Sequence, residues 1–151
     1  MDDVRELMQG LPFVEHLGIE MVSVGDGRAV GRLTLSPEHS SNPDRTVAHG
    51  GVTYALADTV GGAAAVERVG TVTPTVDMRM DYLAPATDDL RAEAELLRVG
   101  GSVAVADVEV TLPDGTRVAT ARGVYKSGGD AGDSPWTAGG TRWGGRGSAV
   151  E

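Results

Sequence analysis

The chain has 151 residues, a length that suits a single domain with its own hydrophobic core. It contains no cysteine, which excludes disulfide bonds and a thiol nucleophile. The formal net charge is −9, with 13 basic and 22 acidic residues, which disfavours nucleic acid as a partner because nonspecific affinity for phosphate backbones comes from clustered lysine and arginine.

The N-terminal stretch, MDDVRELMQG, is acidic and leads into no apolar segment of the kind found in secretory signals. No apolar run approaches the roughly 18 residues that a membrane span requires. We therefore expect a cytoplasmic protein that does not associate with membranes.

The first predicted elements are a short helix and two strands. The helix covers residues 2–9, where aspartates favour the N-terminal end and apolar residues recur at helical spacing. A turn that begins at Pro12 follows, and then a strand at residues 19–25. The Gly-Asp-Gly sequence at 25–27 predicts a hairpin turn into a second antiparallel strand, RAVGRLTLS.

The central predicted element is a long helix. A loop rich in Ser, Asn, Asp and Pro precedes it, and the alanine-rich helix is expected from about residue 50 to about residue 68, with its end near Gly70. After Asp58 the helix carries so little charge that we expect it to be buried nearly all round.

Four more strands are predicted after the helix. Residues 75–82 alternate, with Val76, Met78, Met80 and Tyr82 on one face and Thr75 on the opposite face. If Val76 and Met78 pack inward, Thr75 points away from the core of its own chain. The stretches LRAEAELLRVG, SVAVADVEVTL and TRVATARGVYK follow. The pattern predicts an α+β fold in which an antiparallel sheet of five to six strands wraps one long helix.

The predicted domain ends where the composition changes. Residues 1–126 form the domain, whereas residues 127–151 are rich in glycine and have almost no aliphatic pattern. Such a segment cannot bury enough apolar surface to offset its loss of chain entropy. We predict a disordered C-terminal tail.

Two adjacent glycines, Gly61 and Gly62, lie in the interior of the long helix. Each costs a helix roughly 1 kcal/mol relative to alanine, so a close backbone approach by the sheet or by a ligand would explain them. Neutral packing of small residues is an equally open interpretation.

The same helix opens with His49, Gly50 and Gly51. Glycines at a helix start leave backbone N–H groups uncovered at the positive end of the helix dipole, where they can polarise a carbonyl group; a plain turn is the alternative. His49 has three open interpretations, as a base, a helix cap or a packed side chain. The three histidines lack ligand spacing and no cysteine accompanies them, so no metal site is predicted.

Asp58 is a lone carboxylate on this apolar helix. Burying a carboxylate is costly unless it is paired or functional, so Asp58 is a candidate nucleophile or general base; a bond to a neighbouring strand is the alternative. Gly51 and Asp58 are seven residues apart, on one helix face but separated by about 10 Å along the axis. A reacting carbonyl needs both groups within about 3 Å. If both act, one comes from a second chain, and function requires a dimer.

The sequences HGGVTYALAD at 49–58 and TVDMRMDYLAPA at 75–86 resemble the hotdog-fold acyl-CoA thioesterases of the phenylacetate-degradation (PaaI-like) type. Looser similarity extends the match over roughly residues 10–126 and leaves the tail outside it. The resemblance implies the hotdog fold, a homodimer or a homotetramer built as a dimer of dimers, and active sites between two chains.

By that resemblance, Asp58 is the catalytic carboxylate, and the Gly50 N–H of the partner helix holds the thioester oxygen. Thr75 falls where relatives carry a small hydroxyl residue that helps to position water. His49 belongs to the same motif. Asn42 matches the family's loop amide, although it precedes His49 by seven residues where six are expected.

We expect substrate contacts at Gly51, Gly62 and Arg79. Some relatives carry threonine where this chain has Gly62. The phosphates of coenzyme A need local positive charge, and the candidates are Arg79, Arg91, Arg98, Arg122 and Lys126.

We therefore expect an acyl-CoA thioesterase that releases an aromatic or medium-chain acid and free coenzyme A, with no metal and no further cofactor. The alternatives are a non-catalytic acyl-CoA-binding hotdog protein and a hotdog dehydratase or hydratase. The presence of Asp58 argues against the first, and HGG followed by LAD argues against the second.

Overall fold

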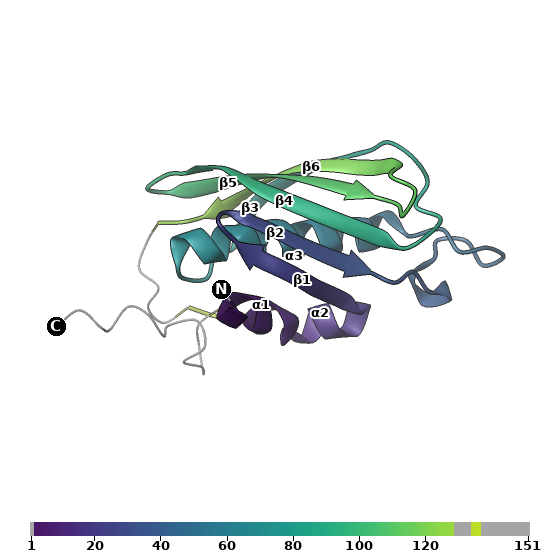
Figure 1. Ribbon diagram of the computed structural model, residues 1–151, viewed down its shortest axis with the longest axis horizontal. Helices are drawn as coiled ribbons and strands as arrows, with labels where there is room; N and C mark the ends of the chain where they lie inside the picture. The colour runs from purple at the N-terminus through teal and green to yellow at the C-terminus, as the bar shows by residue number, and fades with distance from the viewer. Residues whose placement is uncertain (1, 129–133, 137–151) are drawn as a thin grey trace.

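The computed structural model describes residues 2–128 and 134–136. Within them the chain folds as three helices, a short 3₁₀ turn and six strands (Figure 1). Their bounds in chain order are α1 Asp2–Gln9, α2 Pro12–Leu17, β1 Ile19–Gly25, β2 Arg28–Leu33, η1 Pro37–His39, α3 Gly50–Val69, β3 Thr75–Tyr82, β4 Leu90–Val99, β5 Val103–Thr111 and β6 Arg117–Lys126.

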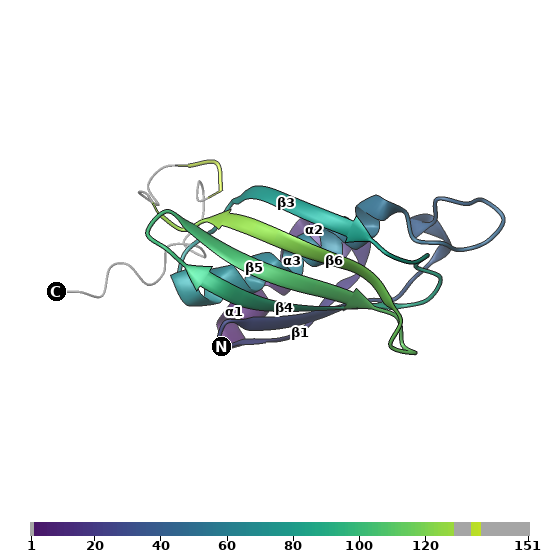
Figure 2. The same ribbon diagram turned by 90° about the horizontal axis from the view of Figure 1, so that it is seen from above.

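The six strands form one antiparallel sheet in the order β1-β2-β4-β5-β6-β3. The long helix α3 lies along one face of this sheet, and the turned view shows the strands crossing over it (Figure 2). β1 and β3 are the two edge strands. The architecture confirms the predicted hotdog fold, with one long helix and a six-stranded sheet.

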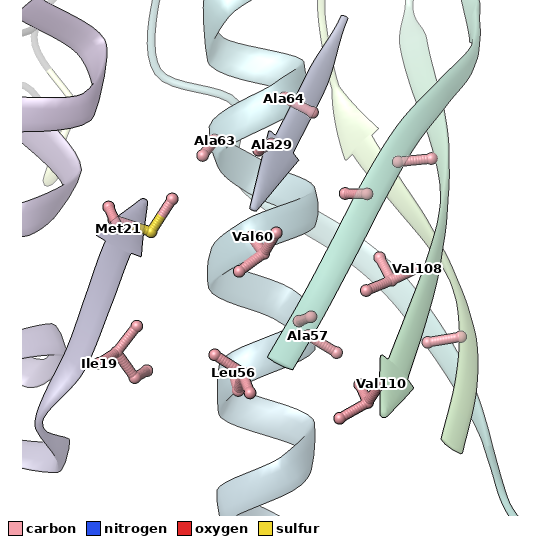
Figure 3. Close-up of a cluster of buried hydrophobic side chains, with 14 of the residues drawn as sticks. Ile19, Met21, Ala29, Leu56, Ala57, Val60, Ala63, Ala64, Val108 and Val110 are labelled. Atoms are coloured by element: carbon pink, nitrogen blue, oxygen red, sulfur yellow. The ribbon is translucent and has the colours of Figure 1, made fainter. Parts of the chain in front are cut away.

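The hydrophobic core lies between α3 and the sheet (Figure 3). Leu56, Ala57, Val60 and Ala63 on the helix are each 0% exposed. The sheet packs tightly against these side chains: a Cβ atom added to Gly31 of β2 would lie 2.6 Å from Val60 Cγ2.

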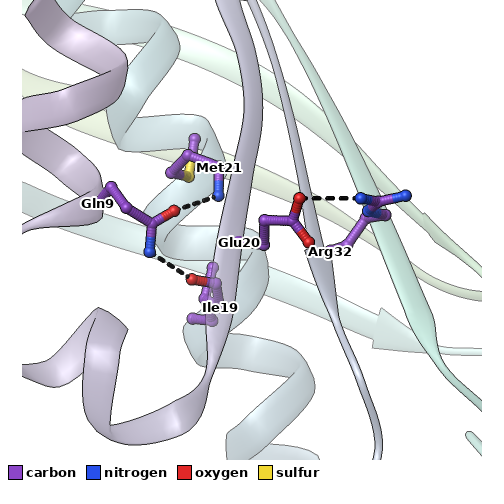
Figure 4. A network of polar contacts seen from close by, with 5 residues as sticks. All are labelled: Gln9, Ile19, Glu20, Met21 and Arg32. Atoms are coloured by element: carbon purple, nitrogen blue, oxygen red, sulfur yellow. Dashed lines mark hydrogen bonds and ion pairs between the residues drawn. The ribbon is translucent and has the colours of Figure 1, made fainter.

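The segment after Pro12 is a helix rather than the expected turn. Proline at the first helical turn needs no N–H partner, and Gly18 ends the helix at a positive φ of 75°. α1 is tied to the edge of β1 by the Gln9 side chain, whose amide nitrogen donates to the Ile19 carbonyl at 2.9 Å and whose oxygen accepts from the Met21 N–H at 2.8 Å (Figure 4).

The long helix is less completely buried than expected. One stripe along it, formed by Gly51, Tyr54, Asp58 and Gly62, is exposed or half-buried, and we call it the open stripe. Tyr54 is 37% exposed. The sheet covers the opposite side of α3, so its wrapping is incomplete in a single chain.

The alternation predicted for β3 is interrupted by a β-bulge. Thr75 pairs with Tyr125 but Asp77 pairs with Val124, so Val76 is an extra residue in the strand. Val76 is 61% exposed and Tyr82 is 54% exposed, whereas Met78, predicted to share their face, is buried. The extra residue also turns the Thr75 side chain toward α3 instead of away from it, as its bond to Asp58 shows.

The domain body continues slightly beyond residue 126, because the N–H groups of Ser127 and Gly128 both donate to the Ser102 carbonyl. The rest of the predicted tail, apart from residues 134–136, lies outside the described residues. In the described part of the chain, no helix is long and apolar enough to cross a membrane.

Candidate active site

Asp58 lies in the middle of the open stripe of α3, and its side chain reaches Thr75, the first residue of β3. The Thr75 hydroxyl donates to Asp58 Oδ1 at 2.8 Å, and the Tyr125 hydroxyl donates to the Asp58 main-chain carbonyl at 3.3 Å. No ion pair within the described residues involves Asp58. The carboxylate therefore does bond to a neighbouring strand, but through a hydroxyl group that leaves its negative charge uncompensated.

Burial raises the pKa of Asp58 above its ordinary value of 3.8. The Thr75 hydroxyl, which donates to the carboxylate, and the nearby Tyr125 hydroxyl lower the pKa and offset part of this increase. A carboxylate with a raised pKa is a stronger base toward water than an exposed aspartate. These are the properties expected of a general base rather than of a purely structural group.

The Asp58→Asn variant is expected to be thermally more stable than the wild type at neutral pH. Because the pKa of Asp58 is raised in the folded state, the folded state binds this proton more tightly than the unfolded state does. Below the ordinary pKa both states are protonated and the burial cost is absent; as pH rises through the folded pKa, the cost of the buried charge lowers the free energy of unfolding. Melting by circular dichroism should therefore give a higher Tm for the variant at about pH 7 and a difference that shrinks toward about pH 3. Equal Tm values at neutral pH would contradict this account.

The start of α3 is capped by His49. Its Nδ1 accepts the Gly51 N–H at 2.8 Å, and its carbonyl accepts the Val52 N–H at 2.9 Å. The structure therefore places His49 as a helix cap, and a neutral ring that accepts at Nδ1 carries its proton on Nε2. None of the hydrogen bonds among the described residues uses the Gly50 N–H. Of Gly50 and Gly51, Gly50 is the one whose N–H group can donate a hydrogen bond to a ligand.

Tyr82 adjoins Gly50 and was not predicted as a site residue. Its hydroxyl donates to the Gly50 carbonyl at 2.7 Å, and a Cβ atom added to Gly50 would lie 3.3 Å from the tyrosine ring. A small cavity of about 190 Å³ lies beside these residues. The alternating pattern gives only the face of β3 on which Tyr82 lies, and its contact with the helix start depends on a segment distant in the sequence.

Gly50 and Asp58 do not meet within one chain. They are eight residues apart on the same helix, which separates them by about 12 Å along its axis.

The two glycines predicted to contact substrate have different positions: Gly51 contributes to the helix cap, and Gly62 lies on the open stripe. A Cβ atom added to Gly62 would make only an ordinary contact, 3.6 Å from Tyr125 Cε1, so packing within the chain does not require glycine there.

Asn42 and Arg79 lie away from this stripe. The Asn42 side-chain oxygen accepts the Asp44 N–H at 2.8 Å, so it is engaged in its own loop, which extends beyond one end of the sheet (Figure 1). Arg79 alternates with the buried Met78 and so lies on the outer face of the sheet, where it pairs with Asp81 at 3.1 Å. The single chain does not bring either residue to Asp58.

Tyr125 is the second residue that sequence reasoning missed. It is 0% exposed, and it packs against Gly61 so closely that a Cβ atom there would overlap the tyrosine hydroxyl. Close packing against the sheet therefore explains why position 61 of the helix is a glycine.

Within the described residues, no group of three or more histidine, aspartate or glutamate side chains could hold a metal ion.

Comparison with known proteins agrees with this architecture. The thioesterase superfamily profile matches residues 46–119. A Halobacterium salinarum protein named as a candidate esterase is 31% identical over 140 residues, which span 83% of this chain and 93% of that protein. The medium/long-chain acyl-CoA thioesterase YigI of Salmonella typhimurium is 30% identical over 134 residues, which span 78% of this chain and 86% of that protein.

A solved structure also shares this fold. The PaaI protein of Escherichia coli, from the phenylacetic acid degradation operon, matches with a TM-score of 0.75 at 26% identity, covering 83% of this chain and 90% of that one. The sequence resemblance and the fold thus agree with independent comparisons. The chain belongs to the thioesterase superfamily and is a PaaI-like thioester hydrolase with the hotdog fold.

Proposed function

We propose that the protein hydrolyses acyl-CoA thioesters at two equivalent sites of a homodimer, each formed by Asp58 of one chain and the Gly50 N–H of the other. The observation that carries the proposal is the unused N–H at the start of α3, about 12 Å from the carboxylate on the same helix. Two antiparallel copies of the helix, related by a two-fold axis, would place each N–H group opposite the partner's carboxylate.

The exposed apolar residues support such a dimer. Val76, Tyr82 and Leu83 are 61%, 54% and 55% exposed, and all belong to the edge strand β3 or directly follow it. Tyr54 on the open stripe adds a further exposed ring. A partner that pairs along β3 would cover this surface and bring the two open stripes together. The same dimer can then assemble into a tetramer as a dimer of dimers.

In the proposed reaction, the thioester oxygen accepts the Gly50 N–H, which polarises the carbonyl carbon. Asp58 takes a proton from water held by Thr75, and the water oxygen adds to that carbon. The tetrahedral intermediate collapses with cleavage of the carbon–sulfur bond, and the thiolate of coenzyme A takes up the proton that Asp58 removed from water. Direct attack by Asp58, through a mixed anhydride that water then hydrolyses, uses the same two groups. Neither route needs a cofactor.

The acyl group is proposed to be aromatic or of medium length. A largely apolar cavity of about 340 Å³ lies beside Thr75, within the size range of small-molecule sites, and its lining includes Val72, Pro74, Val76, Lys126 and Trp136. Three of the five cations considered for phosphate binding are already paired with carboxylates on the sheet surface: Arg79, Arg91 and Arg122. Arg98 and Lys126 have no ion pair among the described residues, which favours them as phosphate contacts.

The test is free-thiol release from a panel of aromatic and straight-chain acyl-CoAs, combined with the molar mass of the protein by light scattering. We expect turnover of at least one series and a mass of two or four chains. Tight binding of acyl-CoA without thiol release would instead indicate the non-catalytic binding protein. A monomer with full activity would exclude a site shared between chains.

A further inference from the structure

Tyr125 occupies a space made by two glycines. On the helix side, a Cβ atom added to Gly61 would overlap the tyrosine hydroxyl. On the strand side, a Cβ atom added to Gly123 would lie 2.7 Å from both the hydroxyl and Cε2 of the same ring. Contacts this short are not tolerated by ordinary side chains, so both glycines are needed for the ring to lie where it does. We call this arrangement the tyrosine slot.

The slot fixes the direction of the Tyr125 hydroxyl. It donates to the Asp58 main-chain carbonyl at 3.3 Å and so fixes the helix backbone at the residue that carries the carboxylate. An ordinary side chain at Gly61 would block this approach to the helix backbone. Burial raises the pKa of Tyr125 well above its ordinary value of 10.0, so the hydroxyl stays protonated and remains a donor throughout the pH range of catalysis.

We propose that Tyr125 is a positioning residue that, together with Thr75, holds Asp58 in the orientation required for attack on the substrate. The two hydroxyls come from different strands, β3 and β6, and reach the same residue of α3. Thr75 holds the carboxylate itself, and Tyr125 holds the main chain that carries it. Small losses of alignment at a reacting centre cost large factors in rate. This inference rests on the proposed role of Asp58 as the catalytic carboxylate.

The other titratable groups at this position are few. Tyr54 lies on the same helix, where its hydroxyl donates to the Met78 carbonyl at 2.9 Å. Burial and the negative charge of Asp58 raise the pKa of Tyr54. The negative charge of Asp77 on β3 also raises the pKa of Tyr54. Tyr54→Phe is therefore a matched control: it removes one phenolic hydroxyl near Asp58 whose bond goes to the sheet and not to Asp58.

The test is the Tyr125→Phe variant, which keeps the ring and removes only the hydroxyl. Since the Tyr125 hydroxyl, a donor beside Asp58, lowers the pKa of this carboxyl group, its loss should raise that pKa further. We expect the acidic limb of the kcat profile to move to higher pH and kcat to fall about tenfold, with KM changed less than about twofold. Titration of the Asp58 side-chain carboxyl by ¹³C NMR should show the same upward shift, and Tyr54→Phe should leave it unchanged.

A second variant keeps the inference testable if Tyr125→Phe does not fold. Gly61→Ala displaces the hydroxyl from the other side and should move the NMR titration in the same direction. In the Tyr125→Phe background, the added methyl group should destabilise the protein less than it does in the wild type. An unchanged Asp58 titration in the folded variant would overturn the inference. Because the NMR titration needs no turnover, it distinguishes this failure from a failure of the proposed activity, which would appear as a wild type that releases no thiol.

Discussion

The Asp58→Asn variant should lose thiol release on every acyl-CoA that the wild type hydrolyses, with kcat lower by about 10²–10⁴-fold. Asparagine can still accept the Thr75 hydroxyl at the same position but cannot take a proton from water or attack a carbonyl carbon. Binding of a non-hydrolysable acyl-CoA analogue should stay within about twofold of the wild type, and the oligomeric mass should not change. Steady-state thiol release and calorimetric titration measure these two properties.

A matched control is Asp114→Asn. Asp114 is an exposed carboxylate in the turn between β5 and β6, where it accepts the Thr116 N–H at 2.9 Å. It should retain wild-type turnover. If Asp58→Asn also retained it, Asp58 would be a structural carboxylate that joins α3 to β3, and the catalytic assignment would be wrong.

The second large effect is expected from a pair of substitutions at the helix start, Gly50→Pro and Gly50→Ala. Both add a Cβ atom next to the Tyr82 ring, but proline alone removes the N–H. Proline is well tolerated at the first position of a helix, and the residue before it, His49, already has the extended ψ of 139° that a following proline requires. We expect kcat of the proline variant to be about 10²–10³-fold below that of the alanine variant, at a similar Tm. Equal kcat values for the two variants would remove Gly50 from the oxyanion site.

Mixing the two inactive variants tests whether the site is shared between chains. In a heterodimer of Asp58→Asn and Gly50→Pro, one site has lost both groups and the other has lost neither. Random reassembly should therefore restore about a quarter of the wild-type activity, because half of the dimers are mixed and each has one intact site. If each chain held a complete site, mixing would restore no activity.

The sequence predicted well the features that depend on local periodicity. The long helix was expected from about residue 50 to 68 and extends over Gly50–Val69, with Gly70 as its C-cap. The alternating pattern of the other segments likewise predicted the antiparallel sheet that packs against this helix. Asp58 and Gly50 were singled out because a lone carboxylate on an apolar helix and an uncovered helix start are both local anomalies.

The features it missed depend on pairing between distant segments. The bulge at Val76 exists only because β3 must match β6, and a period of two read along β3 alone cannot reveal the extra residue. Tyr125 lies two residues after Gly123 in an ordinary strand pattern. Its contact with Gly61 can be predicted only if it is known that β6 crosses α3 at that point. The burial of α3 was overestimated for a similar reason, since a helix partly covered by its own sheet and partly open has the same apolar composition as a fully enclosed one.

The Gln9 side chain bears on how far the protein can assemble. Its amide bonds the outward-facing Ile19 carbonyl and Met21 N–H of β1, as another strand would, and α1 lies alongside that edge (Figure 4). A sheet that is open at both margins can recruit copies without limit, and it is then at risk of forming fibres. With the β1 margin occupied by its own helix, the sheet can extend only through β3, and pairing of two β3 margins leaves none to recruit a third copy. A glutamine far from the chemistry thus favours a closed particle of fixed size over an open-ended polymer.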